Sequence, residues 1–334
     1  SLDRRQRQMC IRDRCIPIYV TALLPIILFP LTGGLDLSAT AAAYGHKLVF
    51  LFLGGFLIAI AIEKWNLHKR LSLNIIKISG NNKSSIILGF MIATAFLSMW
   101  ISNTATSIMI LPVGLAIITQ LKDNPKTTEN ENEVFGKSLM IAIAYSASIG
   151  GMATLIGTPP NMVLAGVVEE SYGIKLNMFD WMKFGVPLSS FLLIICWLYL
   201  TKIAFKFKNE EFSSGKEEIL RQINKLGRFS NEEIKVLVVF TLAALGWIFR
   251  GSIETIFPMI DDTIIAIFFA IVLFIIPTKN LRNNTKILVW KDTIKIPWGI
   301  LILFGGGMAI ASAFGKSGLA CLLYTSPSPR DRSI

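Results

Sequence analysis

Long apolar stretches, separated by short polar segments, follow one another along almost the whole chain. A helix needs about 20 apolar residues, with a range near 17–25, to cross a lipid bilayer. Most of the stretches reach or approach this length, and they lie at roughly 16–31, 47–62, 84–101, 105–121, 138–157, 185–205, 236–250, 260–277 and 297–314. The pattern therefore predicts an all-α polytopic membrane protein.

The composition supports this fold class and excludes soluble and disordered chains. Of the 334 residues, 53% are hydrophobic and 16% are charged, and the mean hydropathy is +0.58. Soluble domains carry about a quarter charged residues, and disordered chains lack apolar mass. The four cysteines show no spacing typical of a zinc site or of a disulfide framework.

Both ends of the chain are predicted to be foreign to the protein. Residues 321–326 read CLLYTS, which the DNA TGTCTCTTATACACATCT encodes, and the reverse complement of this DNA, with a C before it, encodes the QMCIRD found at 8–13. The inverted repeat resembles the transposon end used to prepare sequencing libraries. We therefore exclude 1–14 and 321–334 from the fold, as one would a fusion scar. The remaining residues carry 26 basic and 19 acidic side chains.

The loop charges predict the orientation in the membrane, because Lys and Arg mark the cytoplasmic side. The segments 63–83, 201–235 and 278–296 are rich in Lys and Arg, whereas the loops that alternate with them are not. We assign these three segments to the cytoplasm, so the paired stretches at 84–121 begin and end on that side. His68, in the basic run EKWNLHKR, is expected to anchor an interfacial helix.

Two of the apolar stretches resemble each other. FLGGFLIAIAI at 52–62 and FGGGMAIASAF at 304–314 are 252 residues apart, and by the charge argument they run in opposite directions. Inverted repeats are typical of secondary transporters, although two Gly-rich spans can also look alike because both pack closely. We expect a first repeat at 15–207, an amphipathic cytoplasmic linker at 208–235 and an incomplete second repeat at 236–320.

A first polar break, SMWISNTATS at 98–107, separates the two apolar arms of 84–121. It fits a re-entrant hairpin whose break is buried in protein or lines a cavity, or an extramembrane turn capped by Ser and Asn. Amide and hydroxyl groups can bind a carboxylate or a hard cation, and the start of the following helix suits an anion.

A second break, SASIGGMATLIGTPPN at 146–161, interrupts the stretch at 138–169. Two consecutive prolines cannot continue an ordinary helix, and they push the preceding residue out of the helical region. The freed carbonyl groups near Gly157 can face a cation, as in the broken helices of transporters. A simple proline kink is the alternative.

The sequence gives no reason to expect an enzyme. No Ser/His/Asp set, HExxH helix or membrane-buried carboxylate pair is recognisable. The spans are also poor in Asp and Glu, the usual proton carriers, which favours a metal cation over protons as the coupling ion.

The motifs FLGGFLIAIAIEKWNLHKRL, SMWISNTATSIMILP and SASIGGMATLIGTPPNMVLAG, in this order, resemble the divalent anion:sodium symporter family. This family includes the bacterial sodium/dicarboxylate symporters, and the resemblance extends over nearly all of 15–320. It implies two inverted repeats, each with a re-entrant hairpin tipped by Ser-Asn-Thr. It also implies a homodimer in which a transport domain moves against a fixed scaffold, as in an elevator.

The resemblance also implies roles for individual residues. Ser102, Asn103 and Thr104 are expected to form the first hairpin tip and to contact a substrate carboxylate. The residues expected to hold sodium are Ser98, Ser102, Asn103 and the backbone of Gly157, with Gly151 as another candidate for the last position. The loop between the broken halves is expected to be shaped by Thr158, Pro159, Pro160 and Asn161.

One departure from the family pattern affects the expected function. The chain has one Ser-Asn-Thr and one Thr-Pro-Pro motif, and the offset of the internal repeat places a second Ser-Asn-Thr near position 354. The expected function therefore belongs to a longer parent protein. It is sodium-driven import of a C4-dicarboxylate, such as succinate, fumarate or malate, across the cytoplasmic membrane, with sodium as the coupling ion and no nucleic-acid partner.

Two groups of alternatives remain at this stage. The first is a transporter or exchanger of another divalent anion, such as sulfate, citrate or tartrate. The second is an arsenite or sodium/proton antiporter of the same superfamily.

Overall fold

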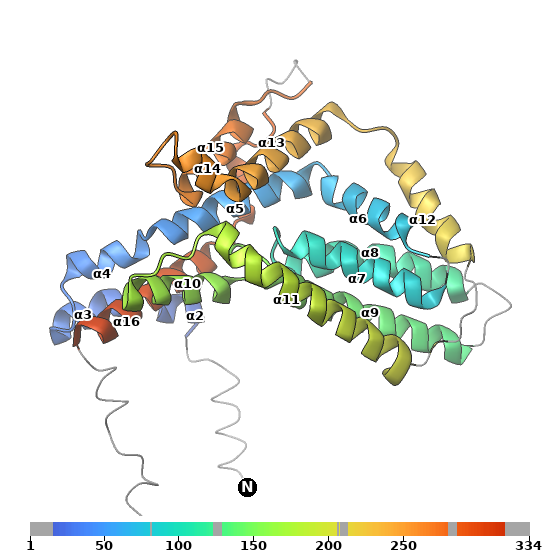
Figure 1. Ribbon diagram of the computed structural model, residues 1–334, viewed down its shortest axis with the longest axis horizontal. Coiled ribbons are helices and arrows are strands. Elements are labelled where there is room, and N and C mark those ends of the chain that lie inside the picture. Colours follow the sequence, from blue (N-terminus) through green and yellow to red (C-terminus); the bar gives the residue numbers. More distant parts are fainter. Residues whose placement is uncertain are drawn as a thin grey trace, which may run out of the picture. The chain divides into compact units, whose positions relative to one another are not determined.

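A computed structural model describes residues 16–80, 82–122, 129–205, 207, 213–279 and 286–317, and these residues are mainly helical without a β-strand (Figure 1). The all-α fold class is thus confirmed. The two predicted foreign ends lie outside the described residues, and their assignment stays a prediction.

The chain divides into two compact units, each described here by itself. The first contains residues up to Leu53, Met162–Leu176 and those from Pro297 onward, and the second contains Gly54–Asn161 and Asn177–Ile296. Helices α5 (Lys47–Lys64) and α10 (Pro159–Tyr172) each contribute to both. The two units are defined by which residues pack together, whereas a repeat is defined by similarity between two parts of the sequence. The units therefore do not test the predicted repeat boundaries, which stay a prediction.

The first unit is a small helical cluster around its last helix. Its remaining helices are α2 (Ile18–Thr21), α3 (Leu24–Thr32), α4 (Leu37–Tyr44) and α16 (Trp298–Ser317). Helix α16 packs against the other three, and the rings of Phe52 and Phe304 meet edge to face with centroids 6.3 Å apart. The predicted stretch 16–31 is divided into α2 and α3, with a proline in the first turn of α3.

The second unit is built around three long helices that run along one another, α7, α8 and α9 (Figure 1). Its helices besides α5 and α10 are α6 (Leu67–Ile78), α7 (Lys83–Ser98), α8 (Asn103–Lys122), α9 (Glu129–Gly151), α11 (Met178–Leu198), the π-helix η1 (Tyr199–Ala204), α12 (Ser213–Leu226), α13 (Asn231–Ile248), α14 (Arg250–Glu254), α15 (Asp262–Ile275) and the 3₁₀-helix η3 (Trp290–Lys295). The apolar core includes Phe90 of α7, Ile117 of α8 and Leu139 of α9, all fully buried.

Five helical segments of the described chain are long and apolar enough to cross a membrane. They are Leu37–Lys64, Asn103–Gln120, Asn132–Gly151, Met178–Ala204 and Trp298–Ser317. Shorter apolar helices add Ile18–Thr32, Lys83–Ser98 and Asp262–Ile275. The prediction of a multi-pass membrane protein is confirmed.

Glycines at the two similar stretches both allow close helix packing. A Cβ atom added to Gly54 would lie 2.7 Å from the Cβ of Ala266, and one added to Gly306 would lie 2.4 Å from the carbonyl oxygen of Ala22. Small residues that let backbones approach are typical of membrane helices. Packing alone therefore accounts for this aligned glycine pair, and the inverted repeat stays a prediction.

The predicted linker contains a helix that packs closely on the second unit. Helix α12 lies against α6 and α8, with Glu218 and Ile219 buried. The guanidinium of Arg70 on α6 donates hydrogen bonds to the carbonyl oxygens of Leu226, Gly227 and Arg228 just after α12. It also donates to both carboxylate oxygens of Glu233, each at 3.2 Å. Arg70 thus ties α6 to the connection between α12 and α13.

Replacing Arg70 by Gln is expected to destabilise the second unit. The side chains of Arg70 and Glu233 are each 7% exposed, and removing one member of a buried ion pair costs about 3–5 kcal/mol because the other charge stays buried. Unfolding in detergent, followed by circular dichroism, measures this loss. Arg228→Gln removes an exposed arginine nearby and should change stability little; equal losses for the two variants would contradict the role of Arg70.

His68 lies on the buried face of α6, where its Nδ1 is 3.2 Å from the carbonyl oxygen of Ile62. Burial lowers the pKa of the imidazole below its ordinary value, and the hydrogen bond to Ile62 opposes this shift without reversing it. The neutral form is therefore favoured in the folded protein.

Acidification is expected to weaken the fold through His68. With the folded pKa below the unfolded value of about 6.5, the unfolded chain binds more protons between the two values, so the free energy of unfolding falls as the pH drops below about 6.5. The variant His68→Gln should lose less stability than the parent chain between about pH 7.5 and pH 5, in the same unfolding assay. An unchanged dependence on pH would show that other groups cause it.

Candidate functional site

Two helix breaks meet inside the second unit. Helix α7 ends at Ser98 and α8 begins at Asn103, while α9 ends at Gly151 and α10 begins at Pro159. A Cβ atom added to Gly151 would lie 2.2 Å from Oδ1 of Asn103. The polar start of one helix therefore touches the last residue of another that lies about 50 positions further along the sequence.

Two residues of the first break, Ser102 and Trp100, hold it in place. Ser102 precedes α8, and its hydroxyl oxygen accepts a hydrogen bond from the N–H of Ala105 at 3.4 Å, as a helix cap does. Trp100 stacks on Trp247 with ring centroids 6.0 Å apart, and it meets Phe240 edge to face at 5.1 Å. This aromatic cluster anchors the break to α13.

Ser98 joins the first break to α9. Its hydroxyl oxygen lies 2.8 Å from Oδ1 of Asn103 and 2.7 Å from the carbonyl oxygen of Ala147. A hydroxyl has one proton and donates it to one of these oxygens at a time. The lone pairs that remain make this a small cluster of oxygen atoms that can accept further bonds. Oxygen atoms of this kind are the ligands that a hard cation requires.

The second break is a structured loop, Met152–Thr158, which is longer than a simple proline kink. Asn161 donates from Nδ2 to the carbonyl oxygens of Gly151 at 2.9 Å and Thr154 at 2.7 Å. The hydroxyl of Thr154 donates to the carbonyl oxygen of Met99 in the first break. Trp181 of α11 donates from Nε1 to the carbonyl oxygen of Met152 at 3.0 Å. The carbonyl groups of Gly151, Met152 and Thr154 are thus satisfied by neighbouring side chains.

The helix ends around the site carry partial charges of both signs. The negative ends of α7 and α9 lie near Ser98 and Gly151, where they favour a cation. Helix α8 begins at Asn103, so the N–H groups of its first turn have no partner within the helix and favour an anion. Helix α10 adds the positive end of its dipole but fewer donors, because Pro159 and Pro160 have no N–H. Groups that favour a cation therefore lie beside groups that favour an anion.

Most of the predicted site residues come together at this point. Ser98, Asn103, Gly151 and Asn161 are linked by the contacts described above, and Ser102 caps α8. Gly157 packs directly against the backbone of Gly151, because a Cβ atom added to Gly157 would be 2.5 Å from the carbonyl oxygen of Gly151. Ser98 and Asn161 are buried, Ser102, Asn103 and Thr158 are half-buried, and Thr104 is exposed on α8. The part of the site around Ser98 and Asn161 is thus the more buried one.

Sequence reasoning gave Thr154, Trp100 and Trp181 no role in the site. Thr154 bridges the two breaks and also accepts a hydrogen bond from the N–H of Gly157 at 3.1 Å. A fully buried threonine in an apolar loop is a usable signal, since its hydroxyl needs a partner. The two tryptophans act through contacts that only the folded chain creates.

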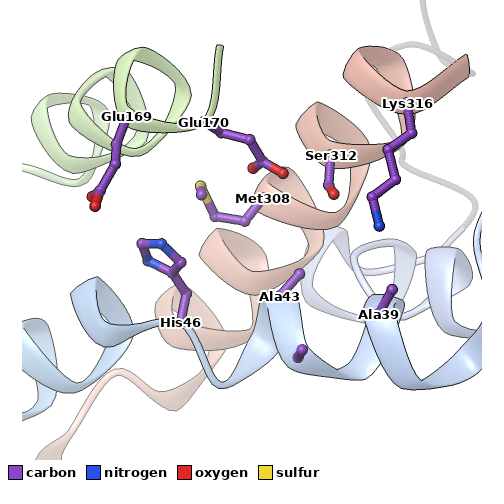
Figure 2. A pocket seen from close by; sticks show the side chains of 9 residues that line it. Ala39, Ala43, His46, Glu169, Glu170, Met308, Ser312 and Lys316 are labelled. Atoms are coloured by element: carbon purple, nitrogen blue, oxygen red, sulfur yellow. The ribbon is translucent and has the colours of Figure 1, made fainter. Parts of the chain in front are cut away.

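The first unit has a cavity of its own, of about 370 Å³ (Figure 2). Glu169, Glu170, His46, Ser312 and Lys316 are among its lining side chains, so its charges are mixed. Glu169 is already paired with Lys47 at 2.6 Å. No predicted site residue lines this cavity, and no group of three or more His, Cys, Asp or Glu suited to a metal occurs among the described residues.

Comparison with known proteins identifies the family. A family model described as the transmembrane region of sodium:sulfate symporters matches residues 9–327. The chain belongs to the divalent anion:sodium symporter family. Sodium-dependent dicarboxylate transporters SdcS of Staphylococcus aureus strains USA300 and NCTC 8325 are each 44% identical over 311 residues, which cover 91% of this chain and 60% of the relative.

Membership of this family settles the class of protein. The family and these relatives are transporters, which confirms the prediction that the chain does not derive from an enzyme. The chain spans about 60% of the length of the relatives that it matches.

Replacing Gly150 by Ala is expected to force α7 and α9 apart. The added Cβ would lie 2.2 Å from the carbonyl oxygen of Ala95, and overpacking of this kind costs about 1–3 kcal/mol. Gly307→Ala is the matched control, because a Cβ there meets nothing within 4 Å and alanine stabilises a helix interior by roughly 0.5–1 kcal/mol relative to glycine. Thermal unfolding in detergent should show a lower melting temperature for Gly150→Ala alone; equal melting temperatures would contradict the close approach.

Proposed function

We propose that the parent protein of this chain is a sodium-coupled secondary transporter that imports a C4-dicarboxylate across the cytoplasmic membrane. The observation that carries the proposal is the oxygen cluster of Ser98, Asn103 and Ala147 beside the start of α8. Sodium occupies the buried side of this site, and a substrate carboxylate occupies the side facing Asn103 and Thr104.

The chemistry of the site supports sodium as the coupling ion. The contacts around the two breaks involve hydroxyl, amide and carbonyl groups of Ser98, Asn103, Thr154 and Asn161, with no carboxylate among the described partners. A carboxylate would be needed for coupling to protons. Broken-helix carbonyl groups coordinate sodium in other transporters; Gly151 ends α9, and Gly157 lies in the loop that follows it.

The relatives support a dicarboxylate as the substrate, since SdcS is described as a sodium-dependent dicarboxylate transporter. The first turn of α8 can supply N–H groups to one carboxylate, and Asn103 and Thr104 can supply side-chain donors. The second carboxylate is expected to meet the corresponding tip of the second repeat. That repeat also supplies the other half of an elevator-type transporter, which we expect to be a homodimer.

Sulfate is the second candidate substrate. The family model that matches the chain is described as belonging to sodium:sulfate symporters. A neutral site with N–H and hydroxyl donors can bind any divalent oxyanion, so substrate competition has to be part of the test.

Sodium dependence of uptake is the decisive measurement. The complete parent gene is recovered by long-read sequencing, and its product is reconstituted in liposomes. Uptake of labelled succinate is expected to require an inward sodium gradient and to cease when choline replaces sodium. Unlabelled fumarate and malate should compete, and competition by sulfate alone would change the substrate assignment. Uptake that persists in choline would reject sodium coupling.

The variant Asn103→Ala tests the site itself. It removes an oxygen from the cation position and a donor from the anion position, and losing a buried polar partner costs about 1–3 kcal/mol. We therefore expect roughly a 5- to 150-fold loss of uptake at limiting sodium. Asn224→Ala, on the exposed face of α12, is the matched control. Unchanged uptake in Asn103→Ala would remove this residue from the site.

A further inference from the structure

The second unit contains a cavity that the proposed transport site does not use. It has a volume of about 410 Å³ and lies between α6, α8 and α12. Volumes of about 300–1,000 Å³ are typical of small-molecule sites. Its lining residues include none of those placed at the two helix breaks.

One side of the cavity is cationic. Lys69 comes from α6, and Arg221 and Lys225 come from α12. The acidic residue in the lining, Glu218, is paired with Arg221 at 3.3 Å and accepts a hydrogen bond from Gln222 at 3.2 Å. Lys69 and Lys225 have no ion pair within the described part of the chain. The rim therefore carries an excess of positive charge that no described partner neutralises.

The other side of the cavity is apolar. It is formed by Met109, Pro112, Val113 and Ala116, which follow one another along α8, with Leu73 of α6. The distance along α8 from Met109 to Ala116 is about 10 Å at a rise of 1.5 Å per residue. A ligand that fits both sides must have an anionic group at one end and an apolar body at the other.

We propose that this cavity binds an anionic phospholipid of the cytoplasmic leaflet. Lys69, Arg221 and Lys225 bind its phosphate, and part of an acyl chain lies along α8. The segments that contain α6 and α12 are the basic ones assigned to the cytoplasmic side, and that leaflet is the one rich in anionic lipid. The two amphipathic helices thus join a charged lipid head to α8, whose first residue is Asn103.

A lipid-binding experiment on the 334-residue chain tests this proposal without requiring transport. The purified chain in detergent is titrated with phosphatidylglycerol, and with phosphatidylcholine as the zwitterionic reference, and bound lipid is counted by native mass spectrometry. The double variant Lys69→Gln/Lys225→Gln should bind phosphatidylglycerol roughly thirtyfold more weakly, since each basic residue contributes about 1 kcal/mol near an anionic lipid surface and about 1.4 kcal/mol is a factor of ten.

The control variant removes the same charge from outside the cavity. Lys77 lies on α6 and Lys291 on η3, both exposed and both in segments assigned to the cytoplasm. Lys77→Gln/Lys291→Gln should bind phosphatidylglycerol as the parent chain does. Equal weakening in the two double variants would mean diffuse attraction to the surface, and it would overturn the proposal.

A second variant distinguishes a lipid from a soluble phosphate. Ala116→Trp fills the apolar side of the cavity and leaves the cationic rim in place. It should weaken binding of phosphatidylglycerol, while glycerol phosphate binds weakly and equally to both chains. Tight binding of glycerol phosphate, with no effect of Ala116→Trp on either ligand, would show that the cavity serves a soluble anion and would overturn the lipid assignment.

Discussion

A helix broken within a membrane leaves backbone N–H and C=O groups that hydrocarbon cannot satisfy. This chain has two helix breaks, and each donates a hydrogen bond to the segment that contains the other. The hydroxyl of Thr154 in the second break bonds the carbonyl oxygen of Met99 in the first. Ser98 at the end of α7 reaches the carbonyl oxygen of Ala147 in the last turn of α9. The breaks are therefore stable together, and neither is expected to keep its conformation alone.

This mutual support requires the helices to approach more closely than ordinary side chains allow. Gly150 lies against the backbone of Ala95, and Gly151 lies against the side-chain amide of Asn103. In both places a Cβ atom on the glycine would overlap these neighbouring atoms. Protein interiors are close-packed, so a volume change of even one methylene at such a contact shifts its neighbours. The glycines thus set the separation of the oxygens that make up the proposed cation position.

The sequence predicted those structural features that depend on residues adjacent along the chain. Glycine, proline and capping residues act on the backbone next to them, so the polar clusters around Asn103 and Pro159 could be located without a structure. Residues that act through distant contacts could not be found in this way. Trp100 matters because it stacks on Trp247, and Arg70 matters because it binds the end of α12. The sequence predicted an amphipathic linker, yet it carries no information that Glu218 is buried together with Ile219.

The geometry of one amide explains how the proposed cation and anion positions can be coupled. The oxygen and nitrogen of an Asn side chain lie on opposite sides of a planar group, so fixing one fixes the other. In the proposed site, sodium and Ser98 both contact Oδ1 of Asn103, which leaves Nδ2 as the donor for a carboxylate. The orientation that sodium selects is then the one that a carboxylate needs. Because coupling between two binding sites is reciprocal, the bound carboxylate must strengthen sodium binding by the same factor. A site without a charged side chain can in this way make the binding of its two ligands interdependent.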